Sequence, residues 1–129
     1  MFRPLILLVD DFTDAREMYA EYLAFRGFAV LTAASGPEAL ALARSERPTL
    51  ILMDIGMRGM TGTEAMQLLR AEPVFAGVPI IAFTAHAMAR EQMQALTDGF
   101  DAVIPKPCFP DQLVTLIQPY LDAFLDTSA

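Results

Sequence analysis

Five short apolar segments alternate along this chain with five segments of helical periodicity. The apolar segments cover residues 5–9, 28–33, 50–53, 79–83 and 102–104, and such short apolar runs are typical of strands covered on both faces. Strands that alternate with helices form a parallel sheet with helices packed on both sides. The sequence therefore predicts an α/β fold with a doubly wound five-stranded parallel sheet.

The helical segments have recognisable ends. Thr13 is expected to cap the first helix, which closes near Gly27, and Ser35 and Glu38 form a capping box that begins the second. The remaining helices are expected from about Thr63 to Pro73, from about Met88 to Thr97, and from about Pro110 through Leu121.

Length and composition limit the class of protein. The 129 residues fit one domain, 1–129. Although 54% of the residues are hydrophobic, no apolar run approaches the roughly 18 residues of a membrane span. The N-terminus shows no export signal, and the single cysteine, Cys108, agrees with a cytoplasmic location. A net charge of −7 repels nucleic acid. We therefore expect no membrane insertion and no direct nucleic-acid binding.

Polar side chains follow or end four of the five predicted strands. Asp10 and Asp11 follow the first, Asp54 the third, Thr84 the fourth and Lys106 the fifth. In a doubly wound sheet, ligands bind outside the carboxyl ends of the strands. The sequence therefore places these five side chains at one edge of the sheet, where they are expected to form one site.

Each of these residues also has a purely structural explanation. The aspartate pair is compatible with a turn or helix cap, Asp54 with a local turn before Gly56, and Thr84 with an ordinary strand residue. Lys106 is compatible with a solvated surface lysine. Several such explanations would have to coincide at the same edge of the sheet, so a shared functional site is favoured.

Three neighbouring carboxylates repel one another and attract a hard divalent cation, and a partly open acidic site suits Mg²⁺. With a metal holding a phosphoryl oxygen, one aspartate attacks phosphorus and forms an aspartyl phosphate. Lys106 and Thr84 would bind the remaining phosphoryl oxygens. This residue set therefore predicts Mg²⁺-assisted phosphoryl transfer to an aspartate.

The segments LLVDDF, LILMDIGMRGMTG, PIIAFTA and DGFDAVIPKP carry these residues in order. Together they resemble the receiver domain of two-component response regulators, the fold of single-domain chemotaxis-type regulators, over nearly the whole chain. The resemblance implies a flavodoxin-like (β/α)5 fold with strand order 2-1-3-4-5. It also implies a frequent cis peptide bond between Lys106 and Pro107.

The resemblance also assigns roles to the residues. It implies that Asp54 is the phosphoacceptor, that Thr84 turns toward the phosphoryl group, and that Lys106 pairs with it. The Mg²⁺ ligands that it implies are Asp10, Asp11 as the more direct ligand, Asp54, and the backbone carbonyl of Gly56. The chain would be a regulatory phosphoacceptor rather than an enzyme, with Mg²⁺-dependent self-phosphorylation and autodephosphorylation.

Several positions depart from the family pattern. Val103 replaces a common aromatic residue three positions before Lys106, Arg58 replaces a common proline, and Pro105 precedes Lys106 directly. Gly56 and His86 occupy the two positions that tune the lifetime of the acyl phosphate in this family. We expect that a glycine at 56 leaves the attacking water unoriented, so that hydrolysis depends mainly on His86.

The expected partners are a sensor histidine kinase or a histidine phosphotransfer protein, together with an unknown downstream protein target. No output domain is expected after Leu121, so a freestanding regulator, a relay shuttle and a receiver cut from a larger chain all stay open. The family's reporting face would include the fourth and fifth helices, although the large apolar side chains there are also compatible with the core: Met88, Met93, Phe109 and Phe124.

Three other functional classes share part of this residue pattern. A haloacid-dehalogenase-type phosphatase needs an Asp-x-Asp motif after its first strand, whereas this chain has adjacent aspartates there. A flavodoxin-like cofactor carrier needs a Ser/Thr/Gly-rich phosphate loop, whereas DDFTDA places acids at that position. A receiver-like protein-binding module that works without phosphorylation stays open, because the switch positions are altered.

Overall fold

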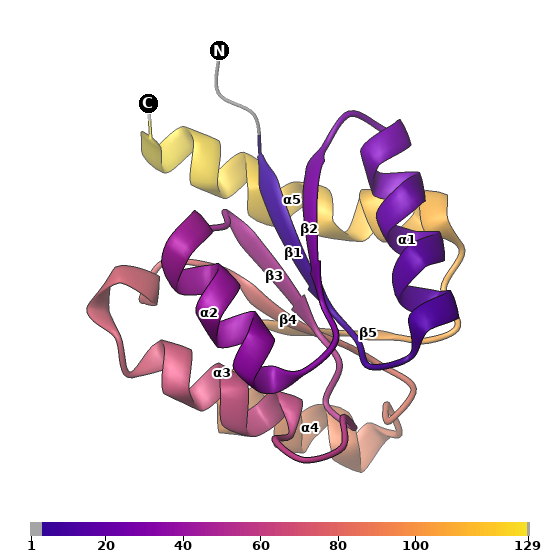
Figure 1. Cartoon of the computed structure of the whole chain (residues 1–129), viewed down its shortest axis with the longest axis vertical. Coiled ribbons are helices and arrows are strands. Elements are labelled where there is room, and N and C mark those ends of the chain that lie inside the picture. Colours follow the sequence, from indigo (N-terminus) through magenta and orange to yellow (C-terminus); the bar gives the residue numbers. More distant parts are fainter. Residues whose placement is uncertain (1–3, 129) are drawn as a thin grey trace.

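A computed structural model describes the backbone over residues 4–128 and the side chains over residues 4–123. Five parallel strands form one sheet in the order β2-β1-β3-β4-β5, as Figure 1 shows. This order confirms the doubly wound flavodoxin-like prediction. The strands are β1 (Leu5–Val9), β2 (Ala29–Ala33), β3 (Leu50–Met53), β4 (Ile80–Thr84) and β5 (Ala102–Pro105).

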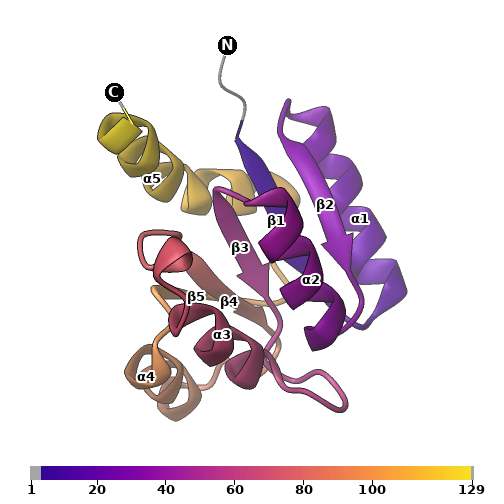
Figure 2. The same cartoon turned by 60° about the vertical axis from the view of Figure 1, so that its left-hand side comes forward.

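Five α-helices cover the two faces of the sheet. Helices α1 and α5 pack on one face, and α2, α3 and α4 pack on the other (Figures 1 and 2). Over residues 4–128, no helix combines the length and the apolarity needed to cross a membrane. The helices are α1 (Thr13–Phe25), α2 (Gly36–Glu46), α3 (Gly62–Arg70), α4 (Ala89–Asp98) and α5 (Pro110–Ser128), with a short 3-10 helix η1 (Pro73–Phe75) between α3 and β4.

The central strands are apolar on both faces because both faces are covered. Along β1, Ile6 and Leu8 pack toward α1 and α5, whereas Leu7 and Val9 pack toward α2 and α3. All four side chains are at most 1% exposed. This explains why continuous apolar runs, rather than an alternation of apolar and polar residues, identified the strands.

Two predicted helix boundaries need correction. Thr13 is the first residue of α1 and not its cap, because Phe12 holds the cap position without a side-chain hydrogen bond. Helix α3 begins at Gly62, one residue from the expected start, but it ends at Arg70 rather than Pro73, which begins η1. Thr61 caps α3 and forms a reciprocal capping box with Glu64. The Thr61 hydrogen bonds lower the pKa of Glu64 from its usual value.

Candidate functional site

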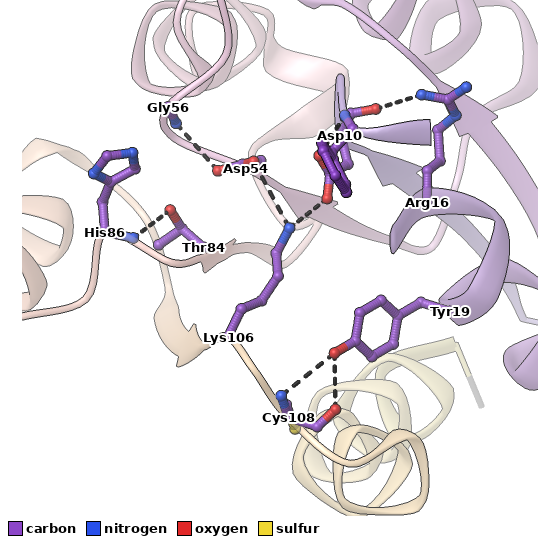
Figure 3. A network of polar contacts seen from close by, with 10 residues as sticks. Asp10, Arg16, Tyr19, Asp54, Gly56, Thr84, His86, Lys106 and Cys108 are labelled. Carbon is purple, nitrogen blue, oxygen red and sulfur yellow. Dashed lines mark hydrogen bonds and ion pairs between the residues drawn. The ribbon is translucent and has the colours of Figure 1, made fainter. Parts of the chain in front are cut away.

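The carboxyl ends of four strands bring the predicted residues together. Asp10 and Asp54 directly follow β1 and β3, Thr84 is the last residue of β4, and Lys106 directly follows β5. Figure 3 shows the Lys106 side chain reaching between Asp10 and Asp54. One carboxylate oxygen from each of Asp10, Asp11 and Asp54 lies within 4.8 Å of the others. The structure therefore brings the three carboxylates and Lys106 together at one edge of the sheet.

Asp10 is buried and is held from three directions. One carboxylate oxygen pairs with Lys106 Nζ, and the other accepts a hydrogen bond from the backbone N–H of Phe12 at 2.9 Å. Its backbone carbonyl accepts a hydrogen bond from Arg16 Nη1 at 2.8 Å. The local turn that Asp10 forms with Phe12 matches the structural explanation considered from the sequence, and it coexists with the clustered site.

Lys106 is not a solvated surface lysine. Its side chain is only 14% exposed, and Nζ lies 3.7 Å from Asp54 Oδ2 in addition to its pairing with Asp10. Burying an ammonium is favourable only with charged partners and hydrogen bonds. Two carboxylates supply them here, so the ammonium lies where an additional anion on Asp54 would meet it. The Lys106–Pro107 peptide is cis.

Asp11 faces the open side of the cluster. Its side chain is 26% exposed, and its Oδ2 accepts a hydrogen bond from the backbone N–H of Arg58 at 3.2 Å, with Arg58 Nε 3.7 Å away. Clustered carboxylate oxygens that are partly open to solvent form a donor set that fits a hard divalent cation such as Mg²⁺, which keeps several of its waters. Arg58, noted in the sequence only as a substitute for proline, is thus also a charge beside the cluster.

Asp54 is fixed by the loop that follows it. Its Oδ1 accepts a hydrogen bond from the Gly56 N–H at 3.1 Å, so the turn considered from the sequence is present. The start of α3 lies directly against its main chain: a Cβ on Gly62 would come 2.7 Å from the carbonyl carbon of Asp54. Gly62 also donates its N–H to the carbonyl of Ile55 at 3.0 Å. The close approach of α3 therefore requires glycine at position 62.

On the far side of Asp54, the Thr84 hydroxyl accepts a hydrogen bond from the N–H of His86 at 3.0 Å (Figure 3). The His86 imidazole packs over Gly56, so that a Cβ added there would lie 2.5 Å from Cδ2 of His86. His86 lies in the loop before α4, and its side chain is 60% exposed. Positions 56 and 86 are therefore in direct contact.

Sequence reasoning missed the supporting residues of this site. Arg16 contacts the main chain of Asp10, and Phe83 lies with its ring 5.1 Å below Lys106 Nζ. Gly62 is required by backbone contact. Arg16 occupies the first turn of α1, but residue type and spacing do not distinguish such a contact from a solvated arginine. In the sequence, Phe83 is indistinguishable from an ordinary strand residue, because Lys106, the charged residue that it contacts, is more than twenty positions away.

Large apolar side chains are exposed away from the cluster. Met88, Met93 and Phe109 are 71%, 71% and 76% exposed, so the alternative that they form core is wrong. Phe124, the fourth residue named with them, lies outside the described side chains. The thiol of Cys108 lies close to the site. Its pKa is raised mainly by burial and to a smaller extent by the negative charge of Asp111.

Comparisons with known proteins agree with this geometry. The family model described as the response regulator receiver domain matches residues 6–118. The chain is 31% identical to the polar-differentiation response regulator DivK of Brucella anthropi over 90% of this chain and 94% of that protein. It is 35% identical to the DNA-binding response regulator MtrA of Mycobacterium tuberculosis over 92% of this chain, and it spans only 51% of that protein.

Solved structures give the same result. A CheY-like response regulator receiver domain protein from Methanospirillum hungatei superimposes with a TM-score of 0.89 at 32% identity, covering 98% of this chain and 99% of that one. The family match over most of the chain replaces the phosphatase and cofactor-carrier alternatives. Because the family model, its strand order and its motif residues all coincide here, the chain belongs to the response regulator receiver domain family, whose members are regulatory phosphoacceptors.

Proposed function

We propose that Asp54 of this chain accepts a phosphoryl group from a phosphohistidine of a sensor kinase or phosphotransfer protein. The observation that carries the proposal is the position of Lys106 Nζ, which pairs with Asp10 and lies 3.7 Å from Asp54 in the same carboxylate cluster. Family membership supports the phosphoacceptor role. The assignment to particular residues rests on the contacts described above.

The reaction conserves atoms and charge in a simple way. A carboxylate oxygen of Asp54 forms a bond to phosphorus while the bond from phosphorus to the imidazole nitrogen of the donor breaks. The imidazole keeps that electron pair and takes up a proton from solvent. With acetyl phosphate as a small donor, the phosphorus–oxygen bond breaks instead and acetate leaves. Asp54 is better suited to this role than Asp10, because its side chain is 15% exposed and lies 3.7 Å from Lys106 Nζ, whereas Asp10 is 3% exposed and pairs more closely with the lysine.

The other residues stabilise the transferred group. Asp10, Asp11, Asp54 and the Gly56 carbonyl would hold Mg²⁺, which when bound neutralises the charge that develops on the phosphoryl oxygens. Lys106 would move from Asp10 and Asp54 to a phosphoryl oxygen, and the Thr84 hydroxyl would supply a further contact. Lys106 and Thr84 would thus make more favourable contacts in the phosphorylated state than in the free one.

The switch would begin at Thr84. Its hydroxyl now accepts a hydrogen bond from the N–H of His86, so turning toward a phosphoryl oxygen releases the loop before α4. Val103, partly buried toward the α4 side of the sheet, is too short to follow Thr84 as an aromatic ring would. We therefore infer that the signal reaches the exposed apolar side chains of α4 mainly through the backbone of the His86 loop.

The proposed setting is cytoplasmic signalling, with a downstream protein target as the second partner. A freestanding regulator, a relay shuttle and part of a longer regulator are all consistent with the relatives, of which one has nearly the length of this chain and another is about twice as long.

The test is intact mass spectrometry after incubation with acetyl phosphate. We expect one added phosphoryl group in the presence of Mg²⁺, none after chelation by EDTA, and none on an Asp54→Asn variant. Asp14→Asn, an exposed aspartate of α1 outside the cluster, is the matched control and should react like the parent. Self-phosphorylation and the rate of spontaneous loss follow from the same time course.

If the parent gains no mass from acetyl phosphate or from a phosphorylated histidine kinase while its circular dichroism shows a folded protein, the proposal is wrong. The second candidate, a binding module that works without phosphorylation, would then be favoured. The observation that supports this second candidate is Val103, which replaces the aromatic residue common at the switch position.

A further inference from the structure

The side chain of Tyr19 connects α1 to the loop that carries Lys106. Its hydroxyl donates a hydrogen bond to the Cys108 carbonyl at 2.8 Å and accepts one from the Cys108 N–H at 3.3 Å (Figure 3). Tyr19 is only 4% exposed. A buried hydroxyl that satisfies both polar groups of one residue fixes that residue's backbone. The backbone two positions after Lys106 is therefore fastened to α1.

The ring of Tyr19 is also connected to Lys106 through the ring of Phe83. It packs edge-on against Phe83, with ring centroids 4.8 Å apart and an interplanar angle of 75°. Phe83 is 1% exposed, and its ring centroid lies 5.1 Å from Lys106 Nζ. An ammonium above an aromatic face is attracted by the ring, and more strongly where water is excluded. Tyr19 thus holds in place the ring on which the ammonium rests.

These two routes converge on one side chain. Before Lys106, its own N–H donates to the Thr84 carbonyl at 2.9 Å, and after it Cys108 is held by Tyr19. A lysine has many rotamers, and placing its ammonium at one point costs conformational entropy. The main chain is fixed on both sides of Lys106, and so is the ring below its ammonium. Less conformational entropy is therefore lost when the ammonium is placed during the reaction.

We propose that Tyr19 is a positioning residue for Lys106, acting through its hydrogen bonds to Cys108 and its contact with Phe83. This inference rests on the proposed phosphoacceptor function and deepens it. The hydrogen bonds and ring contact of Tyr19 are with Cys108 and Phe83 and not with the carboxylates, so the proposed route of its effect on phosphorylation is through the lysine. The consequence is that the Tyr19 hydroxyl matters only while Lys106 is present.

The first variant is Tyr19→Phe, which removes the hydroxyl and keeps the ring. With saturating Mg²⁺ and acetyl phosphate, we expect the rate constant for phosphorylation of Asp54 to fall by about twofold to tenfold, the range of one net hydrogen bond expressed at the transition state. Intact mass against time gives the rate, and circular dichroism gives the folded fraction to which it is normalised.

The decisive measurement is a double-mutant cycle with Lys106→Ala. If Tyr19 acts through Lys106, Tyr19→Phe changes the residual rate of the Lys106→Ala protein by less than its effect on the parent, and ideally not at all. A purely structural role predicts the same fold-loss in both backgrounds, and that result would overturn the inference. An unchanged rate for Tyr19→Phe in the parent would overturn it as well.

Two matched controls accompany the cycle. Tyr22 lies one turn further along α1, and its hydroxyl accepts a hydrogen bond from Arg26 Nη1 at 3.1 Å on the surface. Tyr22→Phe removes that hydroxyl and should leave the rate unchanged. Cys108→Ala alters the loop but keeps both backbone groups that Tyr19 binds.

Should Tyr19→Phe fail to fold, Phe83→Leu takes its place in the cycle, because it removes the ring below the ammonium and should show the same dependence on Lys106. A parent that accepts no phosphoryl group refutes the proposed function. If the parent accepts a phosphoryl group but the effects of Tyr19→Phe and Lys106→Ala on the rate are additive, only the role of Tyr19 is refuted.

Discussion

The two adjacent aspartates after β1 have different environments, although the sequence presents them as a pair. Successive side chains at the end of a strand point in opposite directions, so Asp10 is buried against Lys106 while Asp11 faces the open side of the cluster. The sequence predicted their position at the sheet edge correctly. The family resemblance named Asp11 as the more direct ligand, but the residue pattern alone could not separate the two, because the separation depends on Lys106 reaching Asp10 across 96 positions of the chain.

Because positions 56 and 86 are in contact, we predict that their effects on the lifetime of an acyl phosphate on Asp54 are interdependent. Because a Cβ at position 56 would overlap the His86 imidazole, an asparagine there must displace it before its amide approaches Asp54. We predict that Gly56→Asn speeds hydrolysis of the acyl phosphate in a His86→Ala background and does so less in the parent. The coupling should be about fivefold in rate, or ~1 kcal/mol.

The measurement is the first-order loss of the phosphoryl mass after removal of donor. Gly77→Asn serves as the control, since a Cβ added at position 77 meets no atom within 4 Å. Equal acceleration by Gly56→Asn in both backgrounds would show that the imidazole and the residue at 56 act independently, contrary to the contact.

At the scale of the elements, the strands and the helix starts were predicted to within about one residue, whereas the end of the third helix was placed at Pro73 and lies at Arg70. The strands follow from burial on both faces, which the sequence records directly as apolar runs. The start of α1 was assigned to Thr13 because threonine is a favourable cap. In the structure the Phe12 N–H is instead satisfied by Asp10 Oδ1, a contact that depends on the turn leaving β1.

Glycine begins two of the helices, and the two glycines make a matched pair. At Gly62 an added Cβ meets the main chain of Asp54 at 2.7 Å, whereas at Gly36 it meets the side chain of Met60, including its Cβ at 2.9 Å, and no atom of Asp54. We predict that Gly62→Ala destabilises the fold by about 1–3 kcal/mol, because α3 must move away from β3. It should also slow phosphorylation of Asp54.

Urea unfolding followed by circular dichroism measures the first effect, and intact mass measures the second. Gly36→Ala also requires a shift, since no rotamer of Met60 moves its Cβ, but it displaces no atom of Asp54 and should leave the phosphorylation rate unchanged. Equal losses of phosphorylation rate in the two variants would mean that the approach of α3 to Asp54 is not what slows the reaction.

At the scale of the whole molecule, the carboxylate cluster adds local repulsion to a chain that already carries a net charge of −7. Lys106 offsets part of that repulsion from inside the site. A bound cation would offset the rest, and a ligand that binds only the folded state stabilises it by mass action. The fold and the site are therefore linked, and metal binding should be visible as a change in thermal stability.

We predict that Mg²⁺ raises the Tm of the unphosphorylated protein. At a ~100-fold excess over its dissociation constant the gain is about 2.7 kcal/mol, which for a domain of this size is on the order of 10 °C. Asp11→Asn should abolish the gain with little change in the Tm of the metal-free protein, because Asp11 is partly exposed and lies beside other carboxylates. Chelation by EDTA should return the parent to its metal-free Tm.

Screening must be separated from binding, since any salt weakens repulsion in a protein of this charge. Differential scanning calorimetry in NaCl at matched ionic strength provides that baseline, and Asp14→Asn removes one exposed charge outside the cluster. If Mg²⁺ and NaCl raise the Tm equally, or if Asp11→Asn keeps the full Mg²⁺ gain, the cluster is not the metal site. A gain that is specific to Mg²⁺ and depends on Asp11 would instead make the open side of the cluster the place where the ion enters, because the buried Asp10 already holds Lys106.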